Sequence, residues 1–153
     1  MTLGLLVGRF GNYVRENYVP PVQQPAKEDF PDALIHLREA TGHHLIPLVL
    51  IARADGEFAQ SERDVIVTHC VTFARSRGIE VDGNETLAFS DYIFDFHPTL
   101  MQLDPALHRL SRGEHAEVVA LVGAARAVVE ADGVTRPEET RLLAELADEL
   151  GKL

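Results

Sequence analysis

The sequence predicts an all-α protein that folds as a single compact domain of seven or eight helices. Apolar residues recur at every third or fourth position along most of the chain, which is the spacing that gives a helix one buried face. No stretch alternates apolar and polar residues between hairpin turns, so strands are not expected. A length of 153 residues with 46% hydrophobic residues suits one globular domain with a sizeable core.

The expected helices follow from this spacing and from the residues that interrupt it. Gly42 is placed after the second helix, because glycine adopts the left-handed backbone that ends a helix. Pro47 is expected in a first turn or at a kink, and Asp104 with Pro105 forms a typical cap and first-turn pair. The aromatic residues of 84–96 would also suit a strand, although we expect a helix there. The eight predicted helices cover residues 3–14, 31–41, 45–52, 61–77, 84–96, 104–110, 114–131 and 142–150.

A proline-rich segment separates the first predicted helix from the rest of the chain. Three prolines stand within residues 20–25 and favour extended backbone over helix. We therefore divide the chain into residues 1–28, an amphipathic helix with its linker, and residues 29–153, the main all-α domain. The apolar stripe of residues 3–14 is expected to dock on the main domain, with a membrane surface or a partner as the alternative. Its uncharged run ends at Arg9, which is too short for a membrane span and lacks the features of a signal peptide.

The charge and the cysteine content narrow the classes of function. Fourteen Lys and Arg against 24 Asp and Glu give a formal net charge of −10, and such a field repels phosphate backbones. Nucleic acid is therefore not an expected partner. The single cysteine, Cys70, cannot form an internal disulfide, which favours a cytoplasmic protein. If the apolar stripe of residues 3–14 docks on lipid, the protein lies at the inner face of the membrane.

One motif occurs twice and gives the sharpest signal in the sequence. Residues 54–62 and residues 131–139 both read Ala-Asp-Gly-x5-Glu, 77 residues apart, and each copy lies between two predicted hydrophobic helices. The sequence therefore predicts two repeated units, each made of a helix, an Asp-Gly turn and a second helix. Gly56 and Gly133 are expected to end the preceding helices in the left-handed conformation.

The acidic residues of the two copies, which are Asp55, Glu62, Asp132 and Glu139, allow two interpretations. In the first, they only stabilise the turns, because the aspartates accept amide hydrogen bonds and the glutamates meet the free amides of the next helix. In the second, they converge on a divalent cation. Two carboxylates about 5 Å apart repel by roughly 3 kcal/mol at an effective dielectric constant near 20, so convergence needs a counter-charge. A true EF-hand is not expected, since aliphatic residues stand where calcium needs oxygen ligands.

The doubled Ala-Asp-Gly-x5-Glu motif, with hydrophobic helices on either side, resembles the TerB-like domain of bacterial tellurite-resistance proteins. That family is related to the amino-terminal domain of a membrane-anchored DnaJ-like co-chaperone, and the similarity covers about residues 30–150. The resemblance implies an all-α domain of seven helices without known catalysis, in which the four acids named above are suspected metal ligands. Ala59 and Arg136 stand where the family usually has Ser at the helix start, so the local capping departs from the family pattern.

The histidines and the cysteine give no further predicted site. His43 and His44 are adjacent and are expected to diverge around a helix, and His69 lies on an apolar face, as core or boundary histidines do. Cys70 has apolar neighbours and is expected to be buried, so it is not assigned as a nucleophile. Asp104 and His108 share a helix face, and we expect both to be exposed polar residues.

Together these features predict a non-enzymatic bacterial module of the tellurite-resistance or metal-stress type. Its repeated acidic motif would bind a divalent cation or a protein partner. No catalytic residues are assigned, because a nucleophile, a base and an oxyanion donor cannot be assembled from the sequence. The alternative is a purely structural module that docks on another protein, on a second copy of the chain, or on a membrane through residues 3–14. In that case the acidic residues serve only as helix caps.

Overall fold

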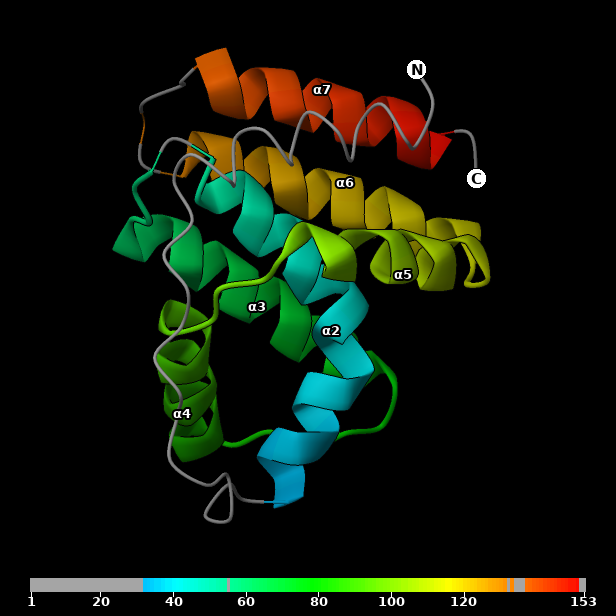
Figure 1. Ribbon diagram of the computed structural model, residues 1–153. Coiled ribbons are helices and arrows are strands. Elements are labelled where there is room, and N and C mark those ends of the chain that lie inside the picture. Colours follow the sequence, from blue (N-terminus) through cyan, green and yellow to red (C-terminus); the bar gives the residue numbers. More distant parts are fainter. Residues whose placement is uncertain (1–31, 55, 132, 134–136, 152–153) are drawn as a thin grey trace.

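The computed structural model describes residues 32–54, 56–131, 133 and 137–151, and within these ranges all regular structure is helical. The all-α class predicted from the apolar spacing is therefore confirmed for this part of the chain. The helix and linker predicted within residues 1–28 lie outside it. The helices are α2 (Asp32–Ala52), α3 (Gln60–Ser76), α4 (Gly83–Phe94), α5 (Leu100–Ser111), α6 (His115–Glu130) and α7 (Pro137–Gly151) (Figure 1).

Helix α2 joins two helices that the sequence predicts separately. The prediction that Gly42 ends a helix is wrong, because the helix continues through it to Ala52. A glycine inside a helix costs about 1 kcal/mol relative to alanine, and burial of the apolar residues on both sides outweighs that cost. Pro47 also lies inside α2, where it removes one helical hydrogen bond. The described residues therefore form six helices, and the expected number of seven or eight is not reached among them.

Helix α2 is the central element of the fold. Its carboxyl-terminal half, from Leu45 to Ala52, is buried on nearly every face. A helix that is apolar all round needs neighbours on all sides, and α2 contacts each of the other five described helices. Buried aliphatic side chains from these helices join it in one hydrophobic core. Polar residues in the middle of α2 are consequently held inside the protein.

Helix α5 begins earlier than the sequence predicts. The expectation that Asp104 and Pro105 start this helix is wrong, because it begins at Leu100. The backbone N–H of Thr99 donates a hydrogen bond to Oε1 of Gln102 at 2.6 Å, which stabilises the earlier start in the manner of a capping box. Pro105 is accommodated inside the helix, about one turn from its beginning.

The two Asp-Gly turns connect α2 to α3 and α6 to α7. Gly56 and Gly133 have φ angles of 85° and 75°, so both adopt the left-handed conformation predicted for them. Their N–H groups donate to the carbonyl oxygens of Arg53 and Glu130 at 3.0 and 3.1 Å. Asp55 and Asp132 lie outside the described residues, and the structural equivalence of the two units stays a prediction.

Several predictions about side-chain exposure are confirmed. Cys70 is fully buried, and burial raises its pKa to about 12, so the thiol stays protonated. Asp104 and His108 are exposed, as expected for surface polar residues. None of the helices within the described ranges combines the length and the apolar character needed to cross a membrane.

Candidate metal centre

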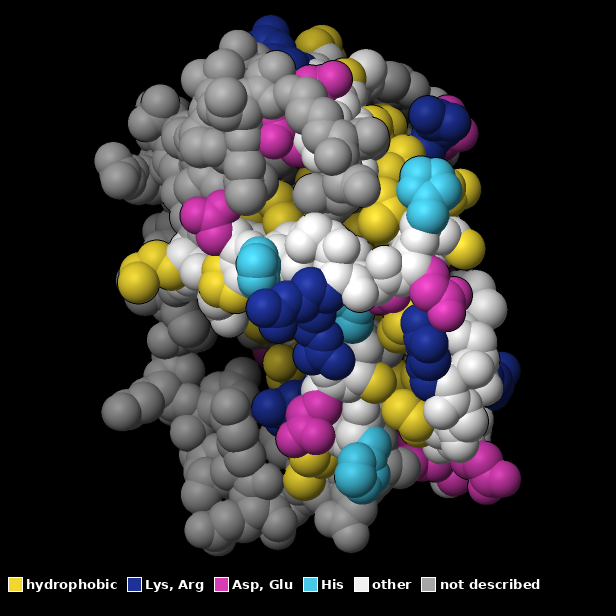
Figure 2. Space-filling view, turned by 90° about the vertical axis from the view of Figure 1, so that its right-hand side faces the viewer, with side chains coloured by type: hydrophobic (Ala, Val, Ile, Leu, Met, Phe, Trp, Pro, Cys, Tyr) yellow, Lys and Arg dark blue, Asp and Glu magenta, His cyan; other side chains and the backbone are white. Residues whose placement is uncertain are grey.

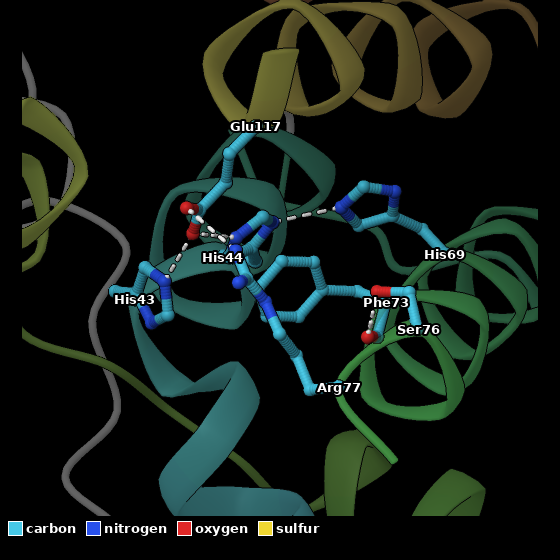
Figure 3. A network of polar contacts seen from close by, with 7 residues as sticks. All are labelled: His43, His44, His69, Phe73, Ser76, Arg77 and Glu117. Atoms are coloured by element: carbon cyan, nitrogen blue, oxygen red, sulfur yellow. Dashed lines mark hydrogen bonds and ion pairs between the residues drawn. The ribbon is translucent and has the colours of Figure 1, made fainter. Parts of the chain in front are cut away.

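Three polar side chains meet between helices α2 and α6. His43 and His44 of α2 both direct their Nε2 atoms at one carboxylate oxygen, Oε1 of Glu117 on α6, at 2.6 and 2.7 Å (Figure 3). All three side chains are at most 7% exposed. Charged residues are rarely buried to this degree unless they are paired. This His43–His44–Glu117 cluster is the strongest candidate for a functional site in the part of the chain that the structure describes.

The expectation that the two adjacent histidines diverge is wrong. Consecutive residues point about 100° apart around a helix, but imidazole rings are long enough to reach one oxygen placed between them. The two rings meet edge to face, with their centroids 4.5 Å apart. Glu117 is more than 70 residues away in the sequence, so local helix geometry does not reveal the convergence.

A third histidine holds His44 from the side opposite Glu117. Nε2 of His69, on α3, lies 2.9 Å from Nδ1 of His44, and the Phe73 ring packs on His44 with centroids 4.3 Å apart (Figure 3). His69 is half-buried, which confirms the expectation of a boundary histidine, although its contact with His44 is not predicted from the sequence. Because one proton must lie between these two nitrogens, the tautomers of His44 and His69 are coupled.

Burial and hydrogen bonding set the charges in the cluster. Burial lowers the pKa of His43 and of His69, and it lowers the pKa of His44 to about 4. Burial alone would raise the pKa of Glu117, but the hydrogen bonds from His44 and His43 outweigh it, and the pKa is lowered overall. At neutral pH the cluster therefore combines neutral imidazoles with one carboxylate, which is the protonation state that binds metal ions.

The donor atoms suit a divalent transition metal. Two imidazole nitrogens and one carboxylate oxygen lie within 4.8 Å of one another. For an ion to enter, the N···O contacts must lengthen from 2.6 and 2.7 Å to about 3.3 Å, the spacing of ligands about 2.0 Å from a tetrahedral ion. In that state the Nδ1–H of His44 can donate to His69, which is the outer hydrogen bond that metal-bound histidines usually make.

One side of the cluster faces a cleft of about 500 Å³. His43 and Glu117 lie in its wall together with three arginines, which are Arg77, Arg109 and Arg112. Nη2 of Arg77 is 3.6 Å from Oε2 of Glu117, the carboxylate oxygen that the histidines do not contact. The cleft gives an ion or a small molecule access to a cluster that is otherwise enclosed by the core.

Glu62 and Glu139, the two predicted metal ligands that the structure describes, do not belong to this cluster. Glu62 and Glu139 are 2% and 1% exposed, and each is the third residue of its helix, α3 and α7 respectively. Oε1 of Glu62 accepts a hydrogen bond from the backbone N–H of Ala59 at 2.8 Å, as a helix cap does. Asp55 and Asp132 lie outside the described residues. Convergence of the four acids on a cation therefore stays a prediction.

Comparison with protein families, with curated proteins and with solved structures gives no match for this chain. The resemblance to TerB-like domains therefore depends on the doubled Ala-Asp-Gly-x5-Glu motif. Any functional assignment has to come from the chemistry of the side chains themselves.

Proposed function

We propose that this protein is a non-enzymatic metal-binding module in which His43, His44 and Glu117 hold a divalent transition-metal ion such as Zn²⁺. The convergence of two neutral imidazole nitrogens on one buried carboxylate oxygen carries this proposal. Histidine nitrogen combined with carboxylate oxygen is a common ligand set for zinc, whereas Ca²⁺ and Mg²⁺ prefer oxygen ligands alone. The described side chains provide the nitrogen and oxygen ligands, and the proposal adds the bound ion.

A purely structural hydrogen-bond network is the competing explanation of the cluster. Two features favour a metal ion over it. His69 stands behind His44 in the place where a metal-bound histidine finds its outer hydrogen-bond partner. His43 and Glu117 line a cleft, so an ion can reach the ligands without unfolding of the core. A network that only links α2 to α6 needs neither a third histidine nor an entrance.

Two histidines and a glutamate around an open fourth position also occur in hydrolytic zinc enzymes. Such an enzyme needs a further group that accepts a proton from the metal-bound water. Glu117 is the only carboxylate among the described residues that line the cleft, and it is already a proposed ligand. The non-enzymatic assignment therefore fits the cleft better than a hydrolase does.

A second candidate site is the repeated acidic motif, in the tellurite-resistance or metal-stress role that the TerB-like resemblance implies. Glu62 and Glu139 have matching positions and matching burial in α3 and α7, which supports a shared role. With Asp55 and Asp132 they would offer the oxygen ligands that a hard ion such as Ca²⁺ needs, or a surface for a protein partner. The hydrogen bond from Ala59 to Glu62 favours the alternative role as a helix cap.

Thermal unfolding with single metal ions tests the two sites against each other. Metal-free protein is titrated with Zn²⁺, and the melting temperature is expected to rise with the occupancy of the site. Glu117→Gln and His44→Gln each remove one ligand with little change in size, and both are expected to abolish the rise. Glu62→Gln changes a buried glutamate at the same helical position and is the matched control, which should respond as the wild type does. Far-UV circular dichroism checks that each variant is folded.

Two outcomes would overturn the assignment. The first is a wild-type melting temperature that does not respond to Zn²⁺, Co²⁺ or Mn²⁺. The second is a response that persists in Glu117→Gln and disappears in the double variant Glu62→Gln, Glu139→Gln, which would transfer the metal site to the acidic motif.

A further inference from the structure

Three arginines gather in one cleft of a protein whose formal net charge is −10. Arg77 directly follows α3, and Arg109 and Arg112 stand at the end of α5. Figure 2 shows Lys and Arg side chains grouped near the centre of one face of the molecule. Like charges repel when they are brought together, so such a group is expected to have a negative counterpart.

The described side chains supply only part of the negative charge that would balance the three arginines. Glu117 is the one carboxylate among the described cleft-lining residues, and it lies near Arg77, with 3.6 Å between Oε2 and Nη2. Arg109 and Arg112 form no ion pair with any described residue. The cleft consequently carries an excess of positive charge.

The cleft also has the dimensions of a small-molecule site. Its volume of about 500 Å³ falls within the range of roughly 300–1,000 Å³ that is typical of ligand pockets. Gly113 forms part of its wall between α5 and α6, and a Cβ atom there would clash with Oε2 of Glu117. The side chain of Glu114, the residue before α6, makes no capping hydrogen bond, so the positive end of this helix adds to the field at the same place.

We propose that this cleft binds a small phosphorylated molecule, whose phosphate group is held by Arg109 and Arg112. Guanidinium groups match phosphate oxygens through paired N–H donors and keep their charge at all physiological pH values. Arg77 borders the same space from α3 and remains close to Glu117. The concave shape suits a soluble ligand better than a lipid surface, and the net charge of −10 disfavours nucleic acid. The site goes beyond the proposed metal centre and requires no ion there.

Calorimetric titration of the full chain with inorganic phosphate and with pyrophosphate tests this site. The protein is freed of metal on a chelating resin, so that the result does not depend on the metal proposal. Sodium chloride at equal ionic strength serves as the reference. Binding is expected for the wild type, and the double variant Arg109→Gln, Arg112→Gln is expected to weaken it about tenfold or more. The matched control, Arg126→Gln with Arg141→Gln, removes two exposed arginines outside the cleft and should bind as the wild type does.

Three results would contradict the site. One is the absence of heat and of any rise in melting temperature at millimolar phosphate and pyrophosphate. Another is an equal loss of affinity in both double variants, which would mean that net charge alone is responsible. The third is a protein that binds neither phosphate nor pyrophosphate but sediments with phosphatidylglycerol vesicles, with this sedimentation depending on Arg109 and Arg112. That result would place the phosphate on a lipid.

Discussion

Glu62 and Glu117 occupy the same position in their helices but have different partners. Each is the third residue of its helix, α3 or α6, and each is buried. Glu62 turns back along its own helix and accepts a hydrogen bond from the backbone N–H of Ala59. Glu117 turns across the core and accepts hydrogen bonds from His43 and His44 of α2. The position of an acid in a helix therefore does not decide its role, because the groups that face it from other helices do.

The residue before each helix helps to explain this difference. Neither Ala59 nor Glu114 provides a side-chain cap for the helix that follows it. In α3 the glutamate takes part in capping through the backbone N–H of Ala59, which is available whatever side chain stands there. In α6 the two imidazoles of α2 offer side-chain N–H donors from another helix, and they hold the carboxylate in the core.

Replacing each glutamate by alanine is expected to produce the largest contrast between the two. Glu117→Ala leaves two buried imidazole N–H groups without their acceptor, so we expect the free energy of unfolding to fall by about 3–5 kcal/mol. Glu62→Ala removes a capping hydrogen bond, and a loss of about 1 kcal/mol is expected. Urea denaturation of the metal-free protein measures the free energy of unfolding of both variants. Losses of equal size would show that the two buried glutamates are equivalent, contrary to our interpretation.

The stability of the metal-free protein should also depend on pH in a way that identifies the cluster. The pKa of His44 is about 4 in the folded protein and 6.5 as the ordinary value, so between these values the unfolded chain binds more protons. Stability is then complete above pH 6.5 and falls as the pH drops toward 4, by about 3 kcal/mol from His44 alone. His43 and His69 act in the same direction, and Glu117 adds a loss below its ordinary pKa of 4.5.

Urea denaturation at several pH values checks this dependence. The variant His44→Gln should lose the share of the change between pH 6.5 and pH 4.5 that His44 contributes, while Glu62→Gln should keep the whole change. A wild-type stability that stays constant over this interval would mean that the histidines are not held in the neutral form by burial.

A smaller contrast separates two glycines that lie close together in the sequence. At Gly113 a Cβ atom would meet Oε2 of Glu117, so we expect Gly113→Ala to displace the carboxylate from the histidines and to cost about 1–2 kcal/mol. At Gly123, in the exposed middle of α6, a Cβ atom meets nothing within 4 Å, and alanine should stabilise the helix by up to about 1 kcal/mol. The melting temperatures of the two variants, each compared with that of the wild type, measure both effects. A stabilising Gly113→Ala would show that the wall of the cleft does not require glycine.

The sequence predicts the helices whose ends are marked by local signals and fails where the core overrides such signals. The expected ranges 61–77 and 114–131 agree with α3 and α6 to within one residue at each end. Gly42 and Pro47 are local helix breakers, but they lie in a helix that is enclosed by five others, and burial keeps it continuous. Propensity is a weak influence once a segment is surrounded by packed neighbours.

The candidate metal centre could not be predicted in the same way, because its contacts are not local. Glu117 meets His43 and His44 across more than 70 residues of sequence. The one available signal was the pair of adjacent histidines followed directly by the apolar run that begins at Leu45. Polar side chains at the edge of a helix that is buried all round need partners from other helices, and only the fold identifies them.

Nitrogen NMR of the histidine side chains tests the central claim most directly. In the metal-free protein at neutral pH we expect the Nε2 atoms of His43 and His44 to carry their protons and to donate to Glu117. On addition of one equivalent of Zn²⁺, both Nε2 signals should shift to the range of metal-bound nitrogen, with the protons moving to Nδ1, and Glu117→Gln should prevent the change. Unaltered Nε2 signals of both histidines in saturating Zn²⁺ would contradict the assignment of this cluster as a metal centre.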